Sequence, residues 1–488
     1  MNLSIIKQTL EEKFGFKAFK PGQLEAIDAV LHDFDTLVML PTGSGKSVCY
    51  QLPGYLKEGL VLVISPLLSL MQDQVERLKK AGERQVAALN SLSSYKEKKR
   101  IFNNLNNLKF LYVSPEMIQY DFIINKLVEV PLALLVVDEA HCISQWGMDF
   151  RPDYLKIGEV KEKLNNPVTI ALTATATNRV REEIKDSLKM DAEHTKEVIY
   201  SVNRDAIKLK VEICEGNKKE KLKEYVKKLQ KPGIIYFSSK KMADEYAQEL
   251  RSELGLLVES YHSDILTDDK IKIQQQFIEN SIQIVCATSA FGMGIDKSDI
   301  RFVIHYHVPS NPEMYLQEIG RCSRDGKDGI AILLFEYGDQ YIQKRLQEDA
   351  LPDKTLLSYV YKNSHNLKFN QEDPKVQIAQ YYQTSKVPLN VASRQIEIRE
   401  NLKSDQLEFM IQYIWHKGCK RSFILGYFDE VLDTATSNCC SSCNSKLEQI
   451  FFEDESISIV NKNVDMNWRN RLKELYKIDD ESIKNRKI

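Results

Sequence analysis

The segment Pro41–Ser47 reads Pro-Thr-Gly-Ser-Gly-Lys-Ser, which is a pattern typical of a loop that binds phosphate. It follows the apolar stretch Thr36–Leu40, which predicts a strand, and precedes a predicted helix. In that setting Lys46 pairs with the terminal phosphates of a nucleotide and Ser47 holds Mg²⁺. The remaining phosphate contacts come from the loop residues next to the helix N-terminus, Thr42, Gly43, Ser44 and Gly45. Taken alone, the same residues also suit a common glycine turn.

A pair of carboxylates follows another predicted strand. The buried stretch Leu134–Val137 leads directly into Asp138-Glu139-Ala140-His141. In a hydrolytic site one carboxylate, here Asp138, orients the metal through its water shell, and the other, Glu139, positions and deprotonates the attacking water. Together with the phosphate loop, this pair predicts hydrolysis of a nucleoside triphosphate coupled to movement.

Short Val/Ile/Leu-rich strands alternate with longer helical stretches, and this pattern runs twice along the chain. It predicts two parallel sheets that carry helices on both faces. The linker between them lies near residues 200–204, and helical signals replace strand signals from about Asp339. The predicted strands include Leu60–Ile64, Phe110–Val113, Leu134–Val137 and Thr169–Leu172, then Gly233–Phe237, Ile282–Val285, Phe302–His305 and Ile330–Leu334.

Composition narrows the class of protein. At 488 residues the chain is too long for one core and suggests about three domains. The N-terminal residues do not form a signal peptide and no apolar run is long enough for a membrane span, so we expect a cytoplasmic, nucleoid-associated protein that does not bind membranes. Nine cysteines, mostly single and in apolar strands, suit a reducing compartment. A net charge of −2 requires any nucleic-acid surface to be local.

In their order along the chain, these motifs resemble the RecQ family of superfamily 2 DNA helicases, and the similarity covers roughly residues 14–443. Residues 14–23 resemble the family's adenine-reading segment. The resemblance implies that Phe16 stacks on the base and that Gln23 hydrogen-bonds its edge, with Lys20 standing where the family usually has arginine. Considered alone, Gln23 would be an exposed polar residue at a helix start.

The most specific resemblance lies after the carboxylate pair, in residues 142–154. In the family this aromatic-rich loop senses single-stranded DNA and couples it to ATP hydrolysis. Trp146, Phe150 and Arg151 match its contact residues, and aromatic rings in such a loop make stacking platforms for bases. Burial of Trp146 in the domain is the alternative.

Three further segments complete the resemblance. Residues 65–74, beginning at Ser65, resemble a motif that grips the DNA backbone, and residues 286–296, with Ser289, resemble one that touches DNA and nucleotide. Arg321 and Arg324 lie three apart before a Gly-containing turn and resemble arginine fingers, which the second sheet domain supplies to ATP bound on the first. A solvated basic face is the alternative for this pair. The basic pairs of residues 208–210, 218–219 and 227–228 are interpreted as solvated helix faces, with contact to DNA as the alternative.

A cysteine cluster closes the recognisable part of the chain. In the family a lone Cys followed by Cys-x₂-Cys-x₂-Cys binds one structural Zn²⁺. Here Cys419, Cys440 and Cys443 match, whereas Ser437 stands where another cysteine is expected. Cys439 is our predicted fourth ligand, His416 is a remote alternative, and unligated buried cysteines remain the main competing interpretation.

The resemblance implies an α/β fold in which two tandem RecA-like parallel-sheet domains precede a small, mainly helical zinc-binding module. We predict boundaries at residues 1–202, 203–338, 339–450 and 451–488, the last a tail with a short amphipathic helix, as in short bacterial forms without winged-helix and further DNA-binding domains. The implied activity is ATP- and Mg²⁺-dependent unwinding of DNA, 3′ to 5′, in recombination, repair and replication. The implied partners are single-stranded and forked or tailed duplex DNA, with single-strand-binding and repair proteins as further candidates. A translocase or RNA helicase, and a non-catalytic DNA-binding scaffold, are the alternatives.

Overall fold

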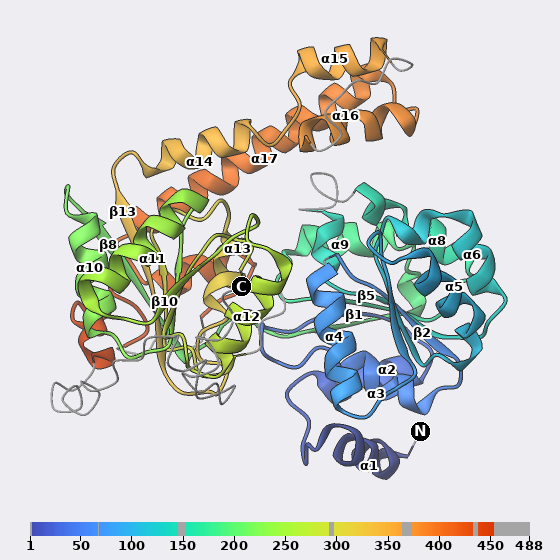
Figure 1. The fold of residues 1–488 in the computed structure, drawn as a ribbon. Coiled ribbons are helices and arrows are strands. Elements are labelled where there is room, and N and C mark those ends of the chain that lie inside the picture. Colours follow the sequence, from blue (N-terminus) through green and yellow to red (C-terminus); the bar gives the residue numbers. More distant parts are fainter. Residues whose placement is uncertain are drawn as a thin grey trace, which may run out of the picture.

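The computed structural model describes residues 2–66, 68–144, 152–291, 297–363, 373–432 and 438–452. Within them the chain forms two lobes that lie side by side and a helical arm that spans both (Figure 1). In this part of the chain no helix is both long and apolar enough to cross a lipid bilayer.

Lobe 1 is built on a parallel sheet with the order β3-β4-β2-β5-β6-β1-β7, seven strands in the described residues. Its central strands are buried on both faces because helices cover each side, which is why they read as unbroken apolar runs. The strands are β1 (Asp35–Met39), β2 (Leu60–Ile64), β3 (Val86–Leu89), β4 (Phe110–Val113), β5 (Leu132–Val137), β6 (Thr169–Thr173) and β7 (Thr195–Ile199).

The helices of lobe 1 follow the strands in the expected alternation. Several begin at side-chain caps, as at Ser94, whose hydroxyl accepts from Glu97 N–H while the Glu97 carboxylate accepts from Ser94 N–H. They are α1 (Leu3–Phe14), α2 (Gln23–Leu31), α3 (Val48–Leu56), α4 (Leu68–Lys80), α5 (Tyr95–Asn103), α6 (Asp121–Val128), α8 (Ile157–Lys163) and α9 (Asn178–Ser187).

Lobe 2 repeats the plan with a parallel sheet in the order β10-β11-β9-β12-β13-β8. Its strands are β8 (Ile207–Cys214), β9 (Gly233–Tyr236), β10 (Val258–Tyr261), β11 (Ile284–Ala287), β12 (Phe302–His305) and β13 (Gly329–Glu336). Its helices are α10 (Lys218–Lys228), α11 (Lys240–Leu254), α12 (Thr267–Ile278) and α13 (Pro312–Ile319). The predicted pair of parallel-sheet domains is therefore confirmed.

The interpretation of the basic pairs as solvated helix faces was wrong for three lysines. Lys218 lies on α10 but is buried, with its ammonium 2.5 Å from the Asp339 carboxylate. Lys208 and Lys210 lie in the edge strand β8 and not on a helix. Lys210 is buried, and its ammonium pairs with Glu212 and Glu448, each 3.0 Å away. The alternation of Ile207, Leu209 and Val211 with these lysines is the period of a strand with one apolar face.

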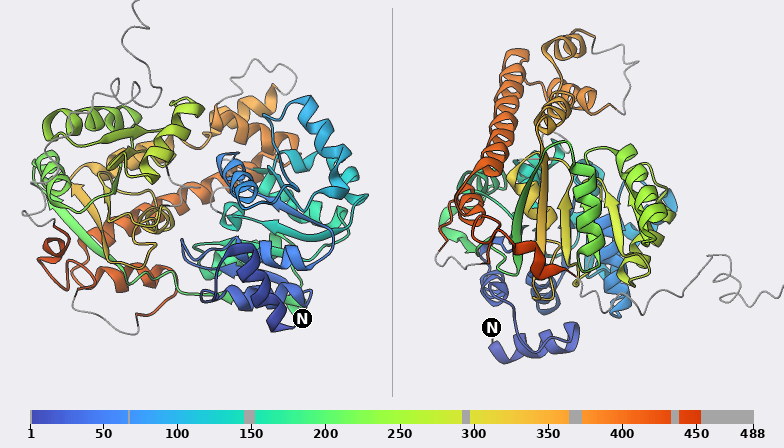
Figure 2. Two further views of the ribbon diagram at one scale, coloured as in Figure 1. Left: turned by 60° about the horizontal axis from the view of Figure 1, so that its bottom comes forward. Right: turned by 90° about the vertical axis from the view of Figure 1, so that its left-hand side faces the viewer.

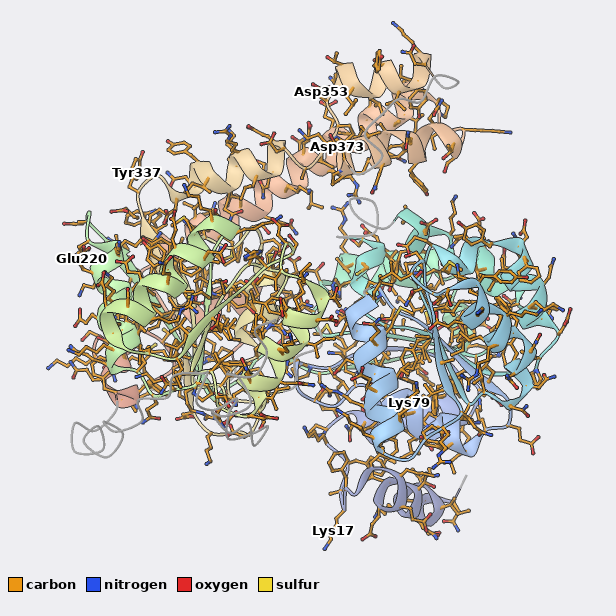
Figure 3. All side chains as sticks on the ribbon, in the orientation of Figure 1. Lys17, Lys79, Glu220, Tyr337, Asp353 and Asp373 are labelled. Carbon is orange, nitrogen blue, oxygen red and sulfur yellow. The ribbon has the colours of Figure 1, made fainter. Side chains whose placement is uncertain are left out.

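The arm consists of α14 (Asp339–Glu348), α15 (Lys354–Lys362), α16 (Pro374–Thr384) and the long α17 (Leu389–Trp415), followed by α18 (Lys420–Tyr427). Figure 2 shows α17 running from lobe 2 across to lobe 1. In Figure 3, Tyr337 marks the root of the arm on lobe 2, and Asp353 lies near its far end. That far end has a small core of its own, including Val360, Ala379 and Ala392.

The other half of the helical region packs into both lobes. Met410, Tyr413 and Ile424 belong to the core on one face of the lobe 2 sheet. Leu425 and Phe428, at the end of α18, belong to the core of lobe 1. Thus α18 is wedged between the lobes, and its burial ties them together.

Candidate functional site

The phosphate loop connects β1 to α3 at the carboxyl edge of the lobe 1 sheet, where open α/β sheets bind ligands. Gly43 and Gly45 have φ of +85° and +77°, a backbone conformation that glycine adopts without strain. The Lys46 ammonium donates to the carbonyl of Leu40, 3.4 Å away. Ser44 Oγ is buried and has no hydrogen-bond partner among the described residues, so the loop retains an unused polar group beside the site.

The carboxylate pair lies beside this loop because β5 ends at Val137. Burial and, after it, the adjacent Glu139 carboxylate raise the pKa of Asp138 to about 7, although Lys46 opposes the increase. Glu139 has φ of +48°, and its carboxylate oxygen Oε2 is buried without a hydrogen bond in the described part of the chain. Asp138 accepts from Glu139 N at 3.0 Å, and His141 Nδ1 lies 3.4 Å from Glu139 Oε2. Two adjacent buried carboxylates with so few partners suit a divalent cation and a water molecule.

His141 connects this pair to the next strand. Its Nδ1 lies 3.0 Å from Thr173 Oγ1, and the Thr173 hydroxyl donates to the carbonyl of Thr175. Because that hydroxyl proton is committed, His141 Nδ1 is the donor in the first bond. The carboxylate pair and residues 172–177 are thereby held in one hydrogen-bonded unit.

A cavity of about 600 Å³ joins the phosphate loop, the carboxylates and lobe 2. The predicted nucleotide and catalytic residues that line it are Phe16, Lys20, Thr42, Gly43, Gly45, Lys46, Ser47, Asp138, Glu139, Arg321 and Arg324. Arg324 approaches the loop closely, since a Cβ built on Gly43 would lie 3.0 Å from its Cγ. Residues that sequence analysis assigned to four separate motifs therefore share one cavity between the lobes.

Gln23 is placed differently from the expectation. It is 3% exposed, and its amide donates to the carbonyls of Ser44 and Gly45. The Lys20 ammonium likewise donates to the carbonyl of Gly43, at 2.9 Å. In this structure both side chains brace the phosphate loop, and a contact between Gln23 and a base requires its amide to release these carbonyls.

The four predicted cysteines form a compact cluster. The sulfur atoms of Cys419, Cys439, Cys440 and Cys443 all lie within 4.8 Å of one another, with 3.3 Å between Cys419 and Cys439. A tetrahedral site with Zn–S distances of ~2.3 Å has S–S edges of about 3.8 Å, so the set fits Zn²⁺. His416 takes no part, because its ring packs on Phe423 with centroids 4.5 Å apart.

Hydrogen bonds prepare one thiol for metal binding. Burial alone would raise the pKa of Cys440, but backbone N–H groups, first among them that of Lys420, bring it down to about 7. Lys420 N lies 3.3 Å from Cys440 Sγ. The same residue, through its ammonium, caps the end of α17 by donating to the carbonyls of Tyr413, Ile414 and His416.

Comparison with known proteins accounts for all three regions. Residues 20–184 match the DEAD/DEAH box helicase family, residues 217–326 match the helicase conserved C-terminal domain, and residues 376–444 match the RecQ zinc-binding domain. The chain is 40% identical over 460 residues to the probable ATP-dependent DNA helicase RecS of Bacillus subtilis, covering 91% of this chain and 92% of that protein. This chain belongs to the RecQ helicase family.

Other relatives match over a shorter part of their length. The ATP-dependent DNA helicase RecQ of Pasteurella multocida is 40% identical over 68% of this chain and 53% of its own. Among solved structures, the DUF1998 helicase MrfA bound to DNA has a TM-score of 0.59 at 20% identity, covering 79% of this chain and 62% of that one. At that identity the likeness shows the fold alone.

The structure also has a second cavity, of about 740 Å³, between the lobes and the arm. It is lined by Pro66 and Ser144 of lobe 1, by Ser289 of lobe 2 and by Arg399 of α17. The predicted Ser289 is thus at this cleft, whereas Ser65 is 1% exposed and is not among the residues that line it. The predicted Trp146, Phe150 and Arg151 lie outside the described residues.

Sequence reasoning missed two arginines, Arg204 in the linker and Arg421 on α18. Arg204 donates to the phosphate-loop carbonyl of Thr42 at 2.6 Å and to that of Ser323 at 2.8 Å. Arg421 is 4% exposed and donates to Asn203 Oδ1 at 2.6 Å. A single arginine in a polar linker carries no signal in one sequence, whereas Arg421 lies two residues after Cys419, the N-cap of α18, and that position marks it.

Proposed function

We propose that the protein moves 3′ to 5′ along single-stranded DNA and separates duplexes during recombination, repair and replication. As a RecQ-family member it is an ATP-dependent DNA helicase. The observation that carries the proposal is the cavity in which the phosphate loop and carboxylates of lobe 1 face two arginines of lobe 2. Hydrolysis in such a cavity changes the contacts between the lobes, and that change can move a strand bound elsewhere.

The proposed roles follow from where each group lies. Lys46 and the loop N–H groups bind the phosphates, Phe16 lines the cavity where a base can stack, and Ser47 and Asp138 hold Mg²⁺. Glu139 accepts the proton of the attacking water, and Arg321 and Arg324 stabilise charge on the transferred phosphoryl group. ATP, when bound, supplies the phosphoanhydride bond whose hydrolysis drives the cycle.

The second cleft is the proposed path of the DNA strand. Lys240, Arg399 and Lys403 bring positive charge to its wall, and Ser144 and Ser289 bring hydroxyls and backbone groups suited to phosphate oxygens. Its cationic lining agrees with a protein of nearly neutral net charge that binds nucleic acid locally. Trp146, Phe150 and Arg151 follow Ser144 in the chain, and we propose that they contact this strand.

Strand displacement tests the direction and the substrate. We expect ATP-dependent unwinding of 3′-tailed and forked duplexes and none of a 5′-tailed duplex, with Lys46→Ala inactive on all three. ATPase stimulation by single-stranded DNA should exceed that by RNA of the same length. Unwinding from the 5′ tail, or equal stimulation by RNA, would contradict the proposal. Single-strand-binding protein and repair proteins are proposed partners, and co-purification on immobilised single-stranded DNA tests them.

A further inference from the structure

Arg204 lies in the linker between β7 and β8 and touches both sides of the nucleotide cavity. Its Nη1 donates to Thr42 O in the phosphate loop and, at 3.3 Å, to Gly320 O in lobe 2. Its Nη2 donates to Cys322 O at 3.3 Å and to Ser323 O at 2.8 Å. One planar guanidinium thus fixes the spacing between a phosphate-loop carbonyl and the turn of lobe 2.

The carbonyls that Arg204 binds surround the arginine fingers. Gly320 and Cys322 flank Arg321, and Ser323 directly precedes Arg324. Ser323 has φ of +60°, an unfavourable backbone conformation for serine that neighbouring contacts must maintain. Gly320 also lies against the phosphate loop, since its Cβ would lie 3.1 Å from Thr42 Cβ. Arg204 therefore supports the turn that sets the direction of both fingers.

Arg421 in turn holds the linker. This buried side chain donates from Nη1 to Asn203 Oδ1 and, at 3.0 Å, to Arg204 O, and from Nη2 to Ile207 O. The same Nη2 reaches Cys439 O at 3.4 Å, on the loop that carries the cysteine cluster. Glu430, just beyond α18, accepts from Ser201 Oγ and from Val202 N at 2.9 Å. The linker is thus fastened by α18 at both ends.

Resting on the proposed function, we infer that Arg204 is a positioning residue for ATP hydrolysis and that Arg421 holds it in place, which connects the cysteine cluster to the nucleotide cavity. Within the described part of the chain, the hydrogen bonds of the Arg204 guanidinium go to backbone carbonyls, that of Thr42 included, and not to the side chains predicted to bind phosphate. Its loss should therefore disturb the aim of Arg321 and Arg324 while leaving the phosphate loop able to bind ATP. The cysteine cluster accordingly acts on catalysis through the linker.

The test measures ATP turnover without DNA, so it is independent of strand direction or nucleic-acid preference. Arg204→Ala should lower kcat about 10- to 100-fold while KM for ATP changes less than about threefold, because fingers act in the transition state. The kcat of Arg204→Lys should lie between those of wild type and Arg204→Ala, since one ammonium cannot reach both lobes at once. Arg179→Ala, an exposed arginine on α9, is the matched control and should equal wild type. A wild-type kcat for Arg204→Ala, or loss of ATP binding together with a collapsed melting temperature, would overturn the role.

Hydrogen exchange tests the link to the cysteine cluster. Arg421→Ala and Cys443→Ala should each speed amide exchange in residues 201–207 and lower kcat, and the double variant should be no worse than the stronger single one. Wild-type exchange in the linker of both single variants, or fully additive losses, would overturn the connection. If wild type fails to unwind DNA but these ATPase and exchange results hold, the proposed function fails and the positioning role survives.

Discussion

Glu139 has an unfavourable conformation and environment, and its proposed role is to accept one proton from water. Its left-handed backbone and its buried carboxylate oxygen without a hydrogen bond in the described residues are both costly, and such costs gather at functional sites. The glutamate is not replaceable by a residue of similar shape, because the water's proton needs an acceptor. The amide of glutamine fills the same space without accepting that proton.

We therefore predict that Glu139→Gln binds ATP but loses turnover by at least about 10²-fold, the contribution typical of a general base. Nucleotide binding and DNA-stimulated ATPase are measured side by side. Glu129→Gln, an exposed carboxylate paired with Lys126, serves as control and should behave as wild type. Normal hydrolysis by Glu139→Gln would remove the residue from the mechanism.

At this scale the sequence predicted which residues line the cavity better than which contacts their side chains make. Lys46, Asp138 and Arg324 stand where their motifs placed them, since each motif is short and follows a strand. The motifs that contain Gln23 and Ser65 do not show which neighbours these side chains contact. Both side chains are buried, and Gln23 donates to phosphate-loop carbonyls. Arg204 acts by joining the phosphate loop to the turn of lobe 2, and the sequence of the linker does not indicate these contacts.

Among the elements, α18 and the cysteine loop depend on one another. Cys419 caps α18, and Cys440 accepts from the backbone of the next residue, Lys420. A metal shared by the four thiols would fix the start of this helix, because the binding energy of a structural Zn²⁺ is folding energy.

Zinc removal provides a direct check. We predict about one zinc per chain by elemental analysis and its loss in Cys443→Ala, with a lower melting temperature. Ser437→Cys restores the family's spacing and should let Cys439 be replaced by Ala without loss of metal. Protein prepared without chelators that contains no zinc would contradict the site.

Helix α13 brings a buried carboxylate to the junction of lobe 2 and the arm. Glu313 is 4% exposed, accepting from Tyr427 OH at 2.7 Å and from the Gln406 amide. Burial raises the pKa of Glu313 to about 7, although these hydrogen bonds favour the charged form. The folded state therefore keeps a proton that the unfolded chain releases from about pH 4.3 upward.

Stability should fall as pH rises between these two values and then stay level, since the folded state binds the extra proton only in that window. Glu313→Gln should match wild type near pH 5 and exceed it at pH 8 by on the order of 1–3 kcal/mol. Denaturant midpoints at both pH values measure the difference, with exposed Glu279→Gln as control. If the stability difference between Glu313→Gln and wild type were the same at pH 5 and pH 8, Glu313 would ionise normally.

Elements were predicted well where one physical signal dominates. Strands β2, β4 and β5 are unbroken apolar runs, and such short runs are typical of strands buried on both faces of a parallel sheet. Strand β8 was predicted as a helix face because its lysines suggested a solvated surface, although their alternation with apolar residues has the period of a strand. The edge strands β7 and β10 are short and partly polar, and the edge strand β3 is a run of only four apolar residues, so their places in the sheets emerge only from pairing.

For the whole molecule, the arm matters because it spans the two lobes. Arg399 on α17 donates to Ser144 O of lobe 1 at 3.3 Å, and the Lys156 ammonium lies 5.2 Å from the ring of Tyr381 on α16. Helical periodicity predicts such helices but not their direction, so this contact could not be anticipated. A DNA strand in the cleft beneath would touch both lobes and the arm together.

We predict that Arg399→Ala weakens binding of single-stranded DNA and reduces the salt slope of log affinity by about one, as expected for one lost phosphate contact. The basal ATPase should be retained. Arg394→Ala, exposed on the same helix and outside the cleft lining, should keep the wild-type slope. Equal slopes for both variants, measured by fluorescence anisotropy at several salt concentrations, would exclude Arg399 from the DNA path.

The cysteine loop lies along the outer strand of lobe 2, and this placement bears on solution behaviour. Leu209 N donates to Cys439 O at 3.1 Å, and Ser441 N donates to Leu209 O at 2.8 Å, so the loop pairs with β8 where the sheet would otherwise end. An uncovered outer strand is a template for pairing with another chain. Metal-depleted protein should therefore self-associate at concentrations where the intact protein stays monodisperse. Aggregation during storage should likewise begin with pairing at β8.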